Sequence, residues 1–68
     1  MMTFKEMNNK NVTVGTILTY RKCSCGDVNM TIGGQYEVQA VKFPMVVYLD
    51  DKGEKRVKTL RTGCFVII

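Results

Sequence analysis

The sequence lacks histidine and tryptophan altogether, and it contains a single proline and no long apolar run. Without histidine, the chain is missing the side chain best suited to proton transfer near neutral pH. Its carboxylates fall mostly in predicted turns and on polar strand faces, and no cysteine has an adjacent base other than a lysine. These absences predict a protein that is not an enzyme and that uses no cofactor and no small-molecule substrate.

Export and membrane signals are also missing. The longest dense apolar segment, Met45 to Leu49, is far shorter than the ~20 residues of a membrane span, so no membrane partner is expected. The segment from Met1 to Glu6 lacks a basic region followed by an apolar stretch and a small-residue cleavage site, which predicts a cytoplasmic protein. The three cysteines, an odd number, cannot form a complete disulfide framework and are expected to be reduced thiols.

What remains is a small and mildly basic chain. Sixty-eight residues make one domain, close to the lower size at which a core stabilises a chain unaided. The apolar content of 46% is normal for a globular protein and too high for a disordered one. The net charge of +4 is a mild bias toward an anionic partner, because dedicated nucleic-acid binders carry denser basic clusters.

Residues 1–11 carry the only helical signal in the chain. Thr3 and Glu6 have the spacing of a capping box, and Phe4 and Met7 lie on one side of the turn that such a box would begin. Three asparagines then follow within four positions and interrupt the helical pattern. We therefore expect an N-terminal arm or one short helical turn here.

From Val12 onward the pattern is typical of strands. β-Branched and aromatic residues are dense from Val12 to Tyr20, and apolar and polar residues alternate from Tyr36 to Ala40. Met45 to Leu49 is apolar at every position, which predicts the most central strand. Two more strands are expected at about 54–59 and 64–68. Five short strands separated by close turns predict an all-β fold, a small five-stranded barrel.

Turn residues connect the last three of these strands. The run from Asp50 to Gly53 predicts a tight hairpin turn, because it places acidic residues before a glycine in the left-handed position. Leu60 to Gly63 predicts a short corner. In the return strand of the hairpin, Val57 is expected to point inward, with Arg56 and Lys58 outward.

This order of features resembles the small SH3-like barrel proteins encoded by many bacteriophages. The residues that carry the resemblance are Val14–Leu18, Met30–Val38, Val47–Glu54 and Cys64–Ile68. The likeness implies an SH3-like β-barrel domain over residues 12–68, preceded by the N-terminal arm. Members of the family look like accessory proteins, and several of them bind and inhibit host factors. The resemblance therefore implies a phage protein in the host cytoplasm that binds a host protein and inhibits or redirects its activity.

The residues expected to contact a protein partner include those beside the only proline. Pro44 fixes a turn that would display Phe43 or Met45 at a loop tip, near the basic residues that open the long loop at Arg21. The predicted protein-binding residues are Tyr20, Arg21, Lys22, Phe43 and Met45. The alternative for Phe43 and Met45 is that both fill one end of the barrel, since a small core needs every large side chain.

Basic residues gather on the predicted hairpin and its return strand, and they suggest an alternative function. They are Lys52, Lys55, Arg56, Lys58 and Arg61. In an outward-facing stripe they would follow a phosphate backbone, which makes nucleic-acid binding the alternative. Three nearby carboxylates partly cancel this charge, and a solvated strand face explains the same lysines. A virion or structural component is a third alternative, which predicts stable self-association.

Cys23-Ser24-Cys25 is the most conspicuous local motif. Two thiolates this close can bind one soft metal ion, with Cys64 as a third ligand and Asp27 as a fourth. Zinc sites usually pair cysteines at two-to-four-residue separation on both sides and add histidine or more cysteine, so this ligand set is incomplete. We therefore expect no metal, and we interpret Cys64 as a small core residue and the other two as free thiols.

Overall fold

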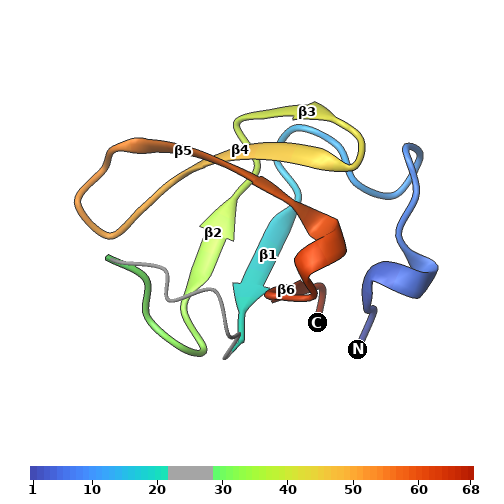
Figure 1. The fold of residues 1–68 in the computed structure, drawn as a ribbon, viewed down its shortest axis with the longest axis horizontal. Coiled ribbons are helices and arrows are strands. Elements are labelled where there is room, and N and C mark those ends of the chain that lie inside the picture. Colours follow the sequence, from blue (N-terminus) through green and yellow to red (C-terminus); the bar gives the residue numbers. More distant parts are fainter. Residues whose placement is uncertain (22–28) are drawn as a thin grey trace.

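The computed structural model describes residues 1–21 and 29–68 and shows an all-β fold (Figure 1). Its strands form two antiparallel sheets of three strands each, in the orders β2-β1-β6 and β3-β4-β5. The strands are β1 (Ile17–Tyr20), β2 (Gln35–Glu37), β3 (Ala40–Lys42), β4 (Met45–Leu49), β5 (Lys55–Thr59) and β6 (Phe65–Val66). Two single-turn 3-10 helices, η1 (Phe4–Glu6) and η2 (Leu60–Thr62), complete the described elements, and η2 lies at the predicted corner. The all-β prediction is confirmed.

The chain passes from one sheet to the other between β2 and β3. The Val38 N–H donates to the Thr16 carbonyl, 2.9 Å away, beside the first sheet, whereas the Gln39 N–H donates to Val47 of the second sheet at 2.7 Å. The single strand predicted from Tyr36 to Ala40 is therefore two strands, which makes six strands in place of the predicted five. Within the described residues, strand pairing leaves two separate sheets and does not close them into one barrel.

Aromatic rings fill the space between the two sheets. Phe65 of β6 is fully buried, and its ring packs edge-on against Tyr20, Tyr36 and Tyr48, with centroids 5.7, 6.3 and 5.0 Å away. These tyrosines come from β1, β2 and β4, so a single phenylalanine joins both sheets. The largest fully buried side chains are Phe65, Leu18, Leu60, Val12, Val38, Val46 and Cys64.

β4 and β5 form the predicted hairpin, and the Asp50–Gly53 turn fixes its register. This register pairs Tyr48 with Arg56 across the two strands. Tyr48 is buried, so Arg56 shares the side that faces the core, whereas Val57 lies on the opposite side and is 62% exposed. The expected orientation, with Val57 inward and Arg56 and Lys58 outward, is therefore wrong.

The N-terminal residues pack against the rest of the chain. Met2 and Ile67 exchange two backbone hydrogen bonds, of 2.6 and 2.9 Å, which places the N-terminus beside the C-terminus (Figure 1). At η1, the Glu6 carboxylate accepts a hydrogen bond from the backbone N of Thr3, which is the bond that Glu6 makes in the predicted capping box, and it also accepts from Thr3 Oγ1. The predicted short N-terminal turn is confirmed, and Met7, directly after it, is buried.

Cys64 is fully buried, as expected of a core residue, and it is disulfide-bonded. The expectation that all three cysteines are reduced is therefore wrong for Cys64, while Cys23 and Cys25 lie outside the described residues. Disulfides are rare in the reducing cytoplasm, and this one therefore does not support the expected cytoplasmic location, which stays a prediction. Among the described residues, no helix has the length and apolar character to cross a bilayer.

We expect one free thiol per chain before reduction and three after it, because one disulfide uses two of the three cysteines. Alkylation with iodoacetamide in denaturant, followed by mass spectrometry of the intact chain, counts the free thiols. The Cys64→Ser variant is the control and should show two free thiols without reductant. Three alkylated thiols in air-oxidised, unreduced wild-type protein would contradict the disulfide.

Candidate protein-binding face

The second sheet presents one side to the core and the other to solvent. Cross-strand partners in an antiparallel sheet share a face, and β4 alternates between buried residues, Val46 and Tyr48, and more exposed ones. The register of β3 and β5 on β4 then assigns every residue of the three strands to a side. The side chains that face away from the core, called the outer face below, are Ala40, Lys42, Met45, Val47, Leu49, Lys55, Val57 and Thr59.

The centre of the outer face is apolar and open to solvent. Val47 of the central strand pairs with Ala40 on one side and with Val57 on the other. Val57 is 62% exposed, Met45 40% and Leu49 38%. Exposed apolar side chains are common when they occur singly, but a contiguous group across three strands is typical of an interaction surface.

The core-facing side of the same hairpin holds a buried carboxylate. The Asp50 side chain is fully buried; its Oδ1 accepts from the backbone N of Lys52 and of Glu54, and its Oδ2 accepts from Nε of Arg56, each at 2.9 Å. Arg56 Nη2 also lies 3.5 Å from Glu54 Oε2. The hydrogen bond from Arg56 lowers the pKa of the Asp50 carboxyl below its ordinary value. Arg56 is therefore occupied in holding the hairpin turn.

A second polar network joins the hairpin turn to the segment before β2. Tyr36 Oη donates to Asp51 Oδ1 at 2.7 Å and accepts from the Thr31 backbone N at 2.8 Å, while Thr31 Oγ1 donates to Asp51 Oδ2 at 2.7 Å. Burial raises the pKa of Tyr36 above its ordinary value. Asp51 also donates its backbone N–H to the Asn29 carbonyl at 2.9 Å. The donors and acceptors of these groups are paired with one another. We therefore interpret the network as one that holds the Asp50–Gly53 turn in position, and not as an acid–base site.

Phe43 is not displayed at a loop tip as expected. It is half-buried, packs against the core cluster and stacks on Phe4, with ring centroids 5.9 Å apart and planes within 9°. The guanidinium carbon of Arg61 lies 6.0 Å from the centroid of the Phe4 ring. The N-terminal residues thus cover Phe43, which supports the alternative that it fills one end of the fold.

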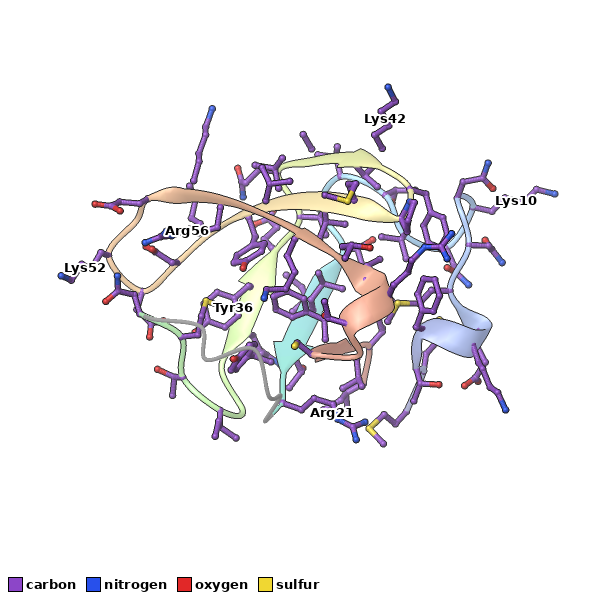
Figure 2. The ribbon with its side chains drawn as sticks, viewed as in Figure 1. Lys10, Arg21, Tyr36, Lys42, Lys52 and Arg56 are labelled. Carbon is purple, nitrogen blue, oxygen red and sulfur yellow. The ribbon has the colours of Figure 1, made fainter. Side chains whose placement is uncertain are left out.

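The other residues predicted to bind a protein do not form one surface within the described part of the chain. Tyr20 is buried in the aromatic core, and Met45 belongs to the outer face. Arg21 is exposed at the lower end of the molecule, well separated from Lys42, which extends from the opposite end (Figure 2). Lys22 lies outside the described residues. Of this predicted set, Met45 alone is an outer-face residue.

The basic residues predicted to bind nucleic acid are divided between different surfaces. Lys55 is on the outer face, whereas Arg56 and Lys58 are half-buried on the opposite side of β5. Lys52 is exposed in the hairpin turn, and Arg61 lies on η2 beside the N-terminal residues. The expected continuous stripe therefore does not form along β5.

The candidate metal ligands are not brought together within the described residues. Cys64 is disulfide-bonded, so its sulfur is not available as a thiolate ligand. The remaining candidates, Cys23, Cys25 and Asp27, lie outside the described residues. In residues 1–21 and 29–68 there is no group of three or more side chains arranged to hold a metal ion.

The described part of the chain encloses no pocket, so the outer face is an open surface. No protein-family model, no curated protein and no solved structure matches this chain.

Six residues of the outer face escaped prediction: Ala40, Lys42, Val47, Leu49, Val57 and Thr59. The available signal was the run from Met45 to Leu49, which is apolar at every position. A strand in a sheet covered on one side only exposes alternate residues, so such a run predicts an apolar outer side as well as an apolar inner one.

Proposed function

We propose that this chain is a non-enzymatic binding module whose partner is a protein, and that it binds through the outer face. The observation that carries the proposal is the apolar centre of that face, with Met45, Leu49 and Val57 each more than a third exposed. Burying such a group against a partner removes apolar surface from water, which is the main favourable contribution to protein association.

We also propose that the fold is an SH3-like barrel and that the protein acts in a bacteriophage-infected host. Two three-stranded sheets around one aromatic core support an SH3-like barrel, which is the fold that the resemblance to phage accessory proteins implies. On the same resemblance, the partner is a host protein whose activity is inhibited or redirected. Nucleic-acid binding has less support, because Arg56 is engaged with Asp50 and Glu54.

Val57→Glu is expected to remove partner binding, with a loss of at least about tenfold in affinity, because it places a charge in the apolar centre. Ile32→Glu is the matched control: Ile32 is 65% exposed, outside the outer face, in the turn before β2. The measurement is affinity purification from nuclease-treated bacterial lysate with both variants and wild type. Thermal melts should show that both variants remain folded.

The proposal requires proteins that wild type and Ile32→Glu retain and that Val57→Glu loses. If Val57→Glu retains the same proteins, binding does not use the outer face. If all binding disappears on nuclease treatment and weakens steeply with salt, the partner is a nucleic acid.

A further inference from the structure

The charge of the outer face has a single sign. Lys42 lies beside Met45 at one end of β4, and Lys55 lies beside Leu49 at the other end. No carboxylate is among the eight outer-face side chains. The apolar centre is therefore flanked by an ammonium group at each end, and Figure 2 shows Lys42 extending away from the sheet.

These two lysines differ from the neighbouring arginine in being unpaired. Among the described residues, neither Lys42 nor Lys55 has an ion pair, whereas Arg56 contacts both Asp50 and Glu54. Glu54 precedes Lys55 directly, but its carboxylate lies against Arg56 on the other side of the hairpin. A charged side chain that has no ion-pair partner within the protein can bind a ligand without breaking an existing ion pair.

A second copy of this chain is a poor match for the outer face. A two-fold dimer brings the same patch of both copies together. Such an interface would hold four lysines, Lys42 and Lys55 of each copy, and no outer-face carboxylate to neutralise them. Like charges at an interface oppose association, so the face is complementary to a different molecule.

A lipid surface is also a poor match. Segments that bind anionic membranes use clusters of about four to eight basic residues, and they place aromatic side chains at the interface. The outer face offers two lysines and no aromatic residue.

We infer that the outer face binds an acidic protein segment, one whose apolar side chains are flanked on both sides by Asp or Glu. This inference rests on the proposed function and specifies the chemistry of the partner. The apolar side chains of the segment cover Val47, Leu49 and Val57, and its carboxylates pair with Lys42 and Lys55. Because the charges lie at the two ends, they set the position of the segment along β4 and accelerate its association.

The probe is a library of random 16-residue peptides displayed on a surface and selected on the whole chain. Enriched peptides should contain apolar residues with Asp and Glu in excess of Lys and Arg. Made synthetically, these peptides should bind the double variant Lys42→Glu/Lys55→Glu at least about tenfold more weakly than wild type. Their affinity should also fall when the salt concentration is raised, since exposed charge pairs are screened.

The matched control is Lys5→Glu/Lys10→Glu, which makes the same change in net charge at two exposed positions outside the outer face. It should change the affinity by less than about twofold, because only local charges contribute strongly in salt. A second selection, on the Lys42→Glu/Lys55→Glu variant, should enrich basic peptides in place of acidic ones. Circular dichroism spectra should show that both double variants are folded.

The outcomes separate this inference from the proposed function. In one outcome, the enriched peptides have no acidic excess, but the Val57→Glu substitution removes their binding. This result would keep the outer face as a protein-binding surface and overturn the inference about charge. Peptides that bind Val57→Glu as tightly as wild type, or no enriched peptide at all, would overturn both. If the chain binds phosphatidylglycerol vesicles and Val57→Glu removes that binding, the partner is a membrane and not an acidic segment. If the chain self-associates and Val57→Glu removes the self-association, the partner is a second copy.

Discussion

Replacing Phe65 by alanine is expected to lower the free energy of unfolding by about 3–5 kcal/mol, the usual cost of emptying a buried phenylalanine site. The ring contacts Tyr20, Tyr36 and Tyr48, and so it is shared by both sheets. A chain of this length has a total stability of about 3–10 kcal/mol, so the substitution should remove from about a third of that stability to all of it. Urea unfolding followed by circular dichroism measures the effect.

Phe65→Leu is the control for this substitution. Leucine keeps most of the apolar volume and loses the edge-on contacts with the tyrosines, so a smaller loss of about 1–2 kcal/mol is expected. Equal losses for the leucine and alanine variants would show that ring geometry, rather than cavity volume, sets the cost. A loss below about 1 kcal/mol for Phe65→Ala would contradict the packing between the sheets.

Replacing Asp50 by alanine is expected to lower the melting temperature by on the order of 10 °C. The carboxylate is fully buried and accepts three hydrogen bonds, and its removal leaves the backbone N–H groups of Lys52 and Glu54 and the Arg56 guanidinium without this acceptor. Asp50→Asn should cost less, because the amide oxygen can still accept from the turn. A melting temperature unchanged by Asp50→Ala would contradict this account of the hairpin.

The same carboxylate should make stability depend on pH in the acid range. Because Arg56 lowers the pKa of Asp50 in the folded state, folding is favoured when this carboxylate is ionised. Its contribution is fully present above the ordinary pKa of 3.8 and is lost as the pH falls from there through the lower folded-state pKa. The difference in unfolding free energy between wild type and Asp50→Asn should therefore be constant near neutral pH and shrink below about pH 4.

Local chemistry made several elements predictable. Acidic residues followed by Gly53 specify the hairpin turn, because the turn needs a left-handed residue and Gly53 has φ 78°. Gly63, with φ 75°, ends η2 for the same reason. The Thr3 and Glu6 pair forms its capping interaction within four residues. Each of these features depends on residues close together in the chain, so the sequence displays it directly.

The orientation of β5 was not predictable from its own residues. Val57 is the only apolar residue from Lys55 to Thr59, and alternation alone places it inward. The hairpin register instead pairs Arg56 with Tyr48, and the buried carboxylate of Asp50 holds Arg56 on the core side. Since β4 is apolar on both sides, its pattern gave no indication of which side faces the core.

Phe43 illustrates a second limit of local patterns. Next to the only proline, it has the sequence context of a displayed side chain, yet Phe4, thirty-nine positions earlier, stacks on it. A contact between residues so far apart leaves no signature near either of them. The outer face has the same property, because it combines residues of three strands that only the strand register brings together.

The sequence by itself determined the all-β class, the hairpin, the corner at Leu60–Gly63 and the absence of histidine chemistry, because each follows from residue identity or from short-range spacing. The tertiary structure alone decided the break between β2 and β3 and which side of the second sheet is exposed. It also decided that two lysines flank an apolar centre there. These features depend on strand register, and register is set by the simultaneous pairing of distant segments around one core.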